Sequence, residues 1–114
     1  MQRFCLTLPM YPDPALLAEY VDRHRRVWPE VLAALREAGV VEMEIYLQDH
    51  RLFMVMDTTD DFTFERKAAI DQANPKVMEW EREMARFQAA DSAADASKKW
   101  ERVERIFRLE PEGV

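Results

Sequence analysis

Hydrophobic and polar residues alternate along three segments of the chain, a pattern that predicts β-strands with one buried face. The segments are residues 2–8, 40–47 and 100–109. Their apolar faces consist of Phe4, Leu6 and Leu8, of Val41, Met43, Ile45 and Leu47, and of Val103, Phe107 and Leu109.

A fourth segment, residues 52–56, is apolar without interruption. Such a run is typical of a strand that is covered on both faces. In a chain of 114 residues the helices can cover only one face of a sheet. We therefore expect a second subunit on the other face, which predicts a homodimer. The short polar segment 48–51 predicts a hairpin between this strand and the one before it.

Apolar residues recur at helical spacing between residues 14 and 38. Asp13 followed by Pro14 is a typical helix start, with an N-cap and then a proline at the first helical position. Gly39 is a typical helix end. Pro29 lies inside the pattern and predicts a kink, because proline lacks a backbone donor and disfavours helical geometry at Trp28.

Two further helices are expected at residues 62–73 and 75–87, separated by an Asn-Pro step. The order strand, helix, strand, strand, helices, strand predicts a ferredoxin-like α+β fold, a β-α-β-β-α-β antiparallel sheet with helices on one face. Two such sheets joined face to face would form a dimeric α+β barrel. We expect one domain over residues 1–110, a mobile loop at 89–97 and a tail at 111–114.

Composition excludes several classes of partner. With 16 basic and 22 acidic side chains the formal net charge is −6, so neither nucleic acid nor an anionic membrane surface is an expected partner. No apolar run approaches the roughly 20 residues of a membrane span, and the first residues lack the pattern of a signal peptide. The lone cysteine, Cys5, has no partner for an internal disulfide. Together these features favour a cytoplasmic protein.

Little in the chain suggests a cofactor. The two glycines, Gly39 and Gly113, cannot form a glycine-rich phosphate loop. His, Cys and carboxylate residues do not cluster at metal-ligand spacing, so no metal is expected. Cys5 lies in an alternating strand, where a half-buried structural role is the simpler interpretation than a nucleophile.

The candidate chemistry centres on His24, one of two histidines. Tyr20, His24 and Trp28 are spaced four residues apart, which places them on one stripe of a helix. Arginines at 23, 25 and 26 would lower the pKa of His24, whereas the acids Glu42, Glu44 and Glu79 would raise it. The sequence leaves this balance open.

Packing in the core is the favoured role of Tyr20, Trp28, Tyr46 and Trp80 on the sequence alone, although their rings also suit the apolar face and hydroxyl rim of a sugar. Glu42 and Glu44 are either solvated strand residues or acceptors for ligand hydroxyls.

The run from Glu19 to Glu30, with its Tyr-x-x-x-His-x-x-x-Trp-Pro-Glu pattern, resembles the L-rhamnose mutarotase family. Gly39, the Ile-Tyr-Leu at 45–47 and the close of the chain at 100–110 carry the same resemblance, which covers nearly the whole chain. The segment 74–84 is more similar to the L-fucose branch of that family.

The resemblance implies a small dimeric α+β protein that interconverts the α and β anomers of a 6-deoxy-L-sugar without a cofactor. It places His24 on the family's catalytic histidine, Tyr20 on a substrate-contacting tyrosine, and Trp80 on or beside one of two pocket tryptophans. Met43 occupies the position of a tyrosine in the family, and Glu79 replaces one of the two pocket tryptophans. These departures imply altered contacts with the sugar and favour L-fucose over L-rhamnose.

The chemistry predicted is ring opening and closing by acid/base catalysis. His24 is the expected acid/base and Tyr20 its hydrogen-bonding partner, with Trp80, Glu79, Tyr46, Met43 and Trp28 as substrate-binding residues. Two alternatives from other classes remain at this stage. One is a cofactor-independent monooxygenase or haem-degrading protein of the same barrel fold, and the other is a non-catalytic sugar-binding module.

Overall fold

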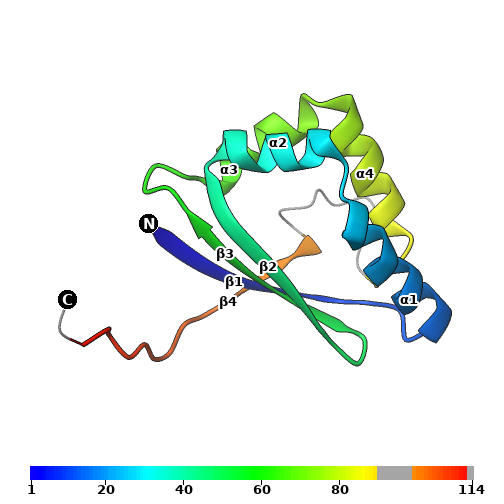
Figure 1. Ribbon diagram of the computed structural model, residues 1–114, viewed down its shortest axis with the longest axis horizontal. Coiled ribbons are helices and arrows are strands. Elements are labelled where there is room, and N and C mark those ends of the chain that lie inside the picture. The colour runs from blue at the N-terminus through cyan, green and yellow to red at the C-terminus, as the bar shows by residue number, and fades with distance from the viewer. Residues whose placement is uncertain (90–98, 113–114) are drawn as a thin grey trace.

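Four antiparallel strands form one sheet in the order β2-β3-β1-β4. A computed structural model describes residues 1–89 and 99–112. The strands are β1 (Gln2–Pro9), β2 (Val40–Gln48), β3 (Arg51–Thr58) and β4 (Glu101–Val103). Helices α1 (Pro14–Arg23), α2 (Pro29–Ala38), α3 (Phe64–Gln72) and α4 (Pro75–Ala85) lie on one face of this sheet (Figure 1). The ferredoxin-like α+β prediction is confirmed.

The helix ends follow local signals in the sequence. The Asp13 carboxylate accepts hydrogen bonds from the backbone N–H groups of residues 15 and 16 and starts α1. The Asn74 amide oxygen does the same for residues 76 and 77 at the start of α4. Gly39 ends α2 with φ +100°, where a Cβ would lie 2.6 Å from Thr59 Oγ1. The signals therefore specify where the chain turns back onto the sheet.

The region around Pro29 corrects one expectation. Instead of one kinked helix, α1 ends at Arg23, a short 3₁₀ turn η1 (His24–Arg26) follows, and α2 begins anew at Pro29. Trp28 has extended geometry, with φ −60° and ψ 139°, because a residue before proline avoids the helical region. Tyr20, His24 and Trp28 therefore do not share a stripe of one helix.

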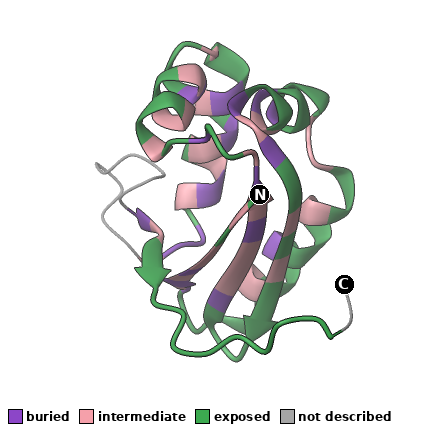
Figure 2. Cartoon of the chain, turned by 90° about the vertical axis from the view of Figure 1, so that its left-hand side faces the viewer, coloured by how far each residue is buried: buried purple, intermediate pink, exposed green. Residues whose placement is uncertain are grey.

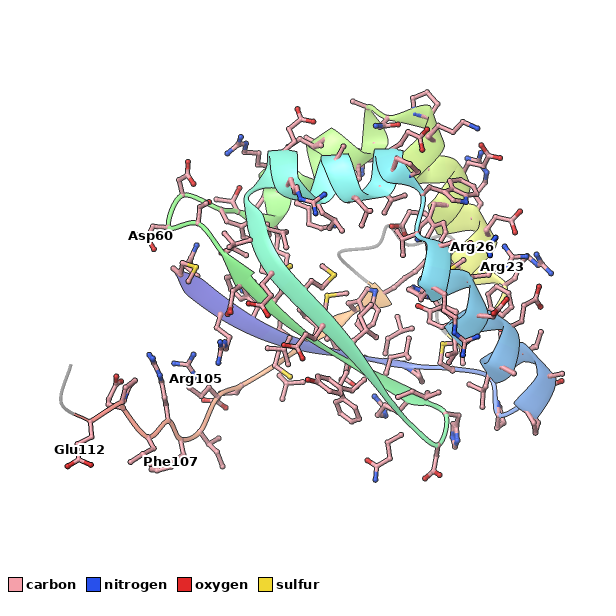
Figure 3. The ribbon with its side chains drawn as sticks, in the orientation of Figure 1. Arg23, Arg26, Asp60, Arg105, Phe107 and Glu112 are labelled. Atoms are coloured by element: carbon pink, nitrogen blue, oxygen red, sulfur yellow. The ribbon has the colours of Figure 1, made fainter. Side chains whose placement is uncertain are left out.

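The last strand is also shorter than expected. Only Glu101–Val103 pair with β1, where the register sets Val103 opposite Cys5, and residues 104–109 continue as an exposed segment. Continuing this register would bring Ile106 opposite Gln2, the first residue of β1, so residues beyond it would have no strand to pair with. In Figures 1 and 3 this segment, which carries Phe107, leads away from the helical layer.

Other boundaries differ by one or two residues. Thr63, whose hydroxyl accepts from the N–H of residue 66, is the N-cap of α3, so this helix begins at Phe64. Helix α4 ends at Ala85. The mobile loop expected at 89–97 falls, apart from Ala89, outside the described residues, as do the last two residues of the expected tail.

The two faces of the sheet differ in how they are covered. On the helical side Leu6, Leu8, Leu52 and Met56 are buried and form the core. Phe53 and Val55 alternate with these residues along β3 and lie on the opposite face, where they are only half-buried, as the colours of Figure 2 illustrate for the sheet. The uninterrupted apolar run of β3 therefore has one covered face and one open face. Among the described residues, no helix is both long and apolar enough to span a membrane.

Candidate active site

A cavity of about 770 Å³ lies between the inner face of the sheet and the helices. This volume is within the range of roughly 300–1,000 Å³ that is usual for small-molecule sites. Much of the wall is apolar, with Met43, Met54 and Met56 from the sheet and Val31 and Leu35 from α2. The polar residues of the wall include Tyr20, His24, Lys67, Asp71, Glu81, Gln88 and Lys99.

His24 opens the η1 turn and lies in the cavity wall between two aromatic rings. Its ring centroid is 4.4 Å from that of Tyr20 and 5.6 Å from that of Trp80. Its Nδ1 lies 2.8 Å from the backbone carbonyl oxygen of Tyr20. Because a carbonyl oxygen only accepts hydrogen bonds, Nδ1 carries the proton, and neutral His24 has its lone pair on Nε2. The fold thus fixes the tautomer that makes Nε2 a base.

Burial lowers the pKa of His24 below its usual value of 6.5, and the hydrogen bond to the Tyr20 carbonyl partly opposes this shift. The neighbouring arginines are not the cause. Arg23 pairs with Glu83 at 2.8 Å and with Glu19 at 3.2 Å, and Arg25 pairs with Asp22. The balance that the sequence left open is therefore decided by loss of solvent around the imidazole.

Tyr20 is only 4% exposed, and its ring packs edge-on against Phe87 at 5.7 Å. Burial raises the pKa of its hydroxyl to about 12, with a smaller contribution from the charge of Glu81 and an opposing hydrogen bond from the Gln88 amide. The hydroxyl therefore stays protonated at neutral pH and serves as a hydrogen-bond donor rather than as a base.

Of the residues expected to bind substrate, Trp80 and Met43 line the cavity beside the two catalytic candidates. Trp28 lies behind Trp80, with ring centroids 5.2 Å apart in an edge-to-face contact, and does not belong to the lining. Trp28 thus supports the wall from outside.

Tyr46 and Glu79 lie elsewhere. Tyr46 is 55% exposed and donates a short hydrogen bond to Glu44 two residues before it on β2. Since Met43 and Ile45 face the cavity, the alternation of a strand turns Tyr46 to the opposite face of the sheet. Glu79 pairs with Lys76 on the exposed side of α4. Neither residue lines the cavity within this chain.

Several polar residues of the wall are not predicted by the sequence pattern. Lys67 and Asp71 on α3 form an ion pair at 2.8 Å, in which the Asp71 side chain is only 9% exposed. Gln88 and Lys99 are both buried. Asp71 stands four residues after Lys67, and this i, i+4 spacing was the one available signal. Gln88 offered none, because it follows the end of α4.

The candidate site has no metal-binding character in the part of the chain that the structure describes. No three His, Cys, Asp or Glu residues gather there in a manner that could hold a metal ion. The free thiol of Cys5 is on a strand residue that does not belong to the cavity wall.

Comparisons with known proteins find relatives in sequence and in fold. A family model described as L-rhamnose mutarotase matches residues 3–109. An L-fucose mutarotase from Xanthomonas campestris is 42% identical over 111 residues, which cover 96% of this chain and 89% of that protein. An L-rhamnose mutarotase from Paraburkholderia phymatum is 46% identical over 50 residues, 42% of this chain and 46% of that protein. The crystal structure of an L-rhamnose mutarotase from Formosa agariphila is similar in fold, with a TM-score of 0.73 at 20% identity over 96% of this chain and 100% of that one.

Proposed function

Because this chain belongs to the L-rhamnose mutarotase family, we propose that it interconverts the α and β anomers of a 6-deoxy-L-hexose, with L-fucose preferred over L-rhamnose. The observation that carries the proposal is the fixed tautomer of His24. A neutral imidazole whose Nε2 is free to accept a proton, in the wall of a cavity of monosaccharide size, is what acid/base catalysis of ring opening requires.

The reaction needs one base that can return its proton. His24 Nε2 takes the proton from the anomeric hydroxyl while the bond between C1 and the ring oxygen breaks, which leaves an aldehyde at C1. The imidazolium then gives the same proton to the former ring oxygen. Rotation about the C1–C2 bond and the reverse proton transfers close the ring on the other face of the carbonyl. No atom is gained or lost, so neither redox chemistry nor a co-reactant enters the reaction.

Tyr20 has the complementary role in this proposal. Its hydroxyl donates a hydrogen bond to the ring oxygen as negative charge develops there, and keeps its own proton. The pKa of about 12 supports this assignment, since loss of the proton from Tyr20 at neutral pH would be costly.

Trp80 would hold one face of the pyranose, and Met43 would contribute to the apolar wall on the side of the sheet. Binding roles for Trp28, Tyr46 and Glu79 have weaker support, because none of them lines the cavity. The preference for L-fucose is supported by the degree of identity: the L-fucose relative is 42% identical over 96% of this chain, whereas an L-rhamnose relative that matches 91% of the chain is 28% identical.

We also propose that two copies pair through the open face of the sheet and the segment 104–109, and that the protein acts in the cytoplasm. The segment presents Ile106 at 92% exposure, Phe107 at 77% and Leu109 at 83%. Exposure of three large apolar side chains to water in so short a segment is unfavourable. A second copy of the chain would bury them. The single cysteine, a free thiol, suits a reducing compartment.

The experiment that tests the proposed function is anomer exchange measured by saturation-transfer proton NMR on L-fucose and on L-rhamnose in parallel. Acceleration of both with L-fucose faster is the expected result. Equal or faster exchange of L-rhamnose would overturn the preference. Sugar binding without acceleration would instead support a binding module, and an oxygen-dependent product or a bound haem would support the alternative activities.

A further inference from the structure

Gln88 is a buried residue whose side-chain amide oxygen, Oε1, accepts no hydrogen bond within the described part of the chain. It is 4% exposed and lies in the wall of the cavity. Among the residues that the structure describes, its Oε1 is the one buried side-chain oxygen or nitrogen without a hydrogen-bond partner. A buried amide oxygen without a donor is costly, so such an atom calls for an explanation.

The backbone around Gln88 is held on both sides. The N–H of Tyr11 donates to the Phe87 carbonyl at 3.2 Å, and the N–H of Ala89 donates to the Pro9 carbonyl at 2.9 Å. Gln88 itself forms an antiparallel bridge with Met10. Phe87 is fully buried and packs against the Tyr20 ring. The position of the amide is therefore set by the fold before any ligand arrives.

The Gln88 amide also contacts the Tyr20 hydroxyl, to which it donates a hydrogen bond. A hydroxyl that accepts from an amide N–H has its own hydrogen free to donate in another direction. With Nε2 committed to Tyr20, the other half of the amide, Oε1, is an acceptor for a group that enters the cavity. A monosaccharide carries a hydroxyl on nearly every carbon, and each is a donor.

We propose that Gln88 determines specificity and positions Tyr20: its Oε1 accepts a hydrogen bond from a non-anomeric hydroxyl of the bound sugar, while its Nε2 holds the Tyr20 oxygen so that the tyrosine proton points to the ring oxygen. This assignment rests on the proposed mutarotase function. It makes a single amide couple recognition of one sugar hydroxyl to the orientation of a group that acts on the ring.

Replacement of Gln88 by methionine tests both halves. Gln88→Met keeps nearly the same length and removes the polar atoms. Gln48→Met, at an exposed position at the end of β2 and outside the cavity, is the matched control. We expect Gln88→Met to raise KM for L-fucose roughly fivefold and to lower kcat roughly fivefold, in line with the loss of one buried hydrogen bond on each side. Both constants within twofold of the control would overturn the proposal.

Two further measurements separate the proposed role from a structural one. The first uses three monodeoxy analogues of L-fucose, which lack the hydroxyl at C2, C3 or C4. The analogue that lacks the hydroxyl bound by Gln88 should have the same affinity for Gln88→Met as for the unaltered protein. If Gln88→Met binds all three analogues more weakly than the unaltered protein does, and by the same factor, recognition of a single hydroxyl is contradicted. In a Tyr20→Phe background, Gln88→Met should lower kcat no further, and an additive loss would contradict the positioning role.

Failure of this inference is distinguishable from failure of the proposed function. If the unaltered protein accelerates exchange of neither sugar, the proposed function fails and this inference fails with it. If it accelerates exchange and Gln88→Met does so equally well, only the role of Gln88 is refuted. Should Gln88→Met fail to fold by circular dichroism, Gln88→Asn takes its place, since it keeps the amide but withdraws it by one methylene group.

Discussion

The role of the Tyr20 hydroxyl leads to a quantitative prediction for Tyr20→Phe. This change removes one oxygen and keeps the ring, whose contacts with His24 at 4.4 Å and with Phe87 at 5.7 Å remain possible. The hydroxyl lies in a residue that is only 4% exposed, so water cannot readily take its place. Loss of its hydrogen bond with the Gln88 amide should lower the free energy of unfolding by only about 1 kcal/mol.

The effect on the reaction should be larger than the effect on stability. If the hydroxyl stabilises charge that develops on the ring oxygen, its removal resembles the loss of one oxyanion donor, which costs about 10²-fold in kcat, or about 2.7 kcal/mol. KM should change little, because the contact strengthens only as the ring opens.

The assay is saturation-transfer NMR over a range of L-fucose concentrations, with thermal unfolding of each variant. Tyr11→Phe is the matched control, because Tyr11 is 46% exposed and does not line the cavity. A decrease in kcat of less than about threefold for a folded Tyr20→Phe protein would refute the reasoning, since an ordinary packing role predicts that result.

Three other predictions concern pH, stability and assembly. Because the pKa of His24 lies below 6.5, Nε2 is unprotonated at pH 7. The catalysed rate of anomer exchange should therefore be constant above pH 7 and fall on acidification. A rate that rises towards acid pH would contradict the role of His24 as a base. The unfolded chain binds this proton at a higher pH than the folded one, so His24 should also make the fold less stable as pH falls below 6.5. Asp71→Ala leaves Lys67 without its carboxylate at 2.8 Å and should lower the free energy of unfolding in urea by about 1–3 kcal/mol, whereas an unchanged midpoint would show that the ion pair contributes nothing. Phe107→Asp should convert a dimer to monomers in light scattering, and a retained dimer would exclude this segment from the interface.

The sequence predicts those features of the fold that depend on local signals. Asp13 and Asn74 mark the starts of α1 and α4, and Gly39 marks the end of α2, because each satisfies backbone groups of its own helix end. The break at Pro29 is more complete than the kink that the sequence predicts. A proline in a helical pattern is compatible with a kink or with a full break, and the packing of α1 and α2 over one sheet decides between them.

The final strand shows a different limit. Alternation at Val103, Phe107 and Leu109 is real in the sequence, but a strand also needs a neighbour to pair with. Among the described residues only 101–103 pair with β1, and β1 ends opposite Ile106, before Phe107 and Leu109. Periodicity reports which side chains favour burial and does not report what is available to bury them.

In the candidate site, too, the sequence predicts the residues that have a local signal and not those that depend on tertiary structure. His24 and Tyr20 were predicted because they carry distinctive chemistry at a distinctive spacing. The sequence does not predict Gln88 and Asp71 as residues of the cavity wall, because their position arises from tertiary structure: Gln88 lies in the wall beside Tyr20, and Asp71 is buried with Lys67. The strand pattern itself predicts the outward orientation of Tyr46, since Met43 and Ile45 have the opposite parity.

The central claim is that the neutral imidazole of His24 catalyses anomer exchange. Saturation-transfer NMR on L-fucose, with the unaltered protein and with a folded His24→Ala variant at equal concentration, tests it most directly. The account predicts that the variant loses roughly 10²–10⁴-fold of the catalysed rate, as expected for removal of an acid/base group. A His24→Ala protein that exchanges the anomers at nearly the unaltered rate would contradict it.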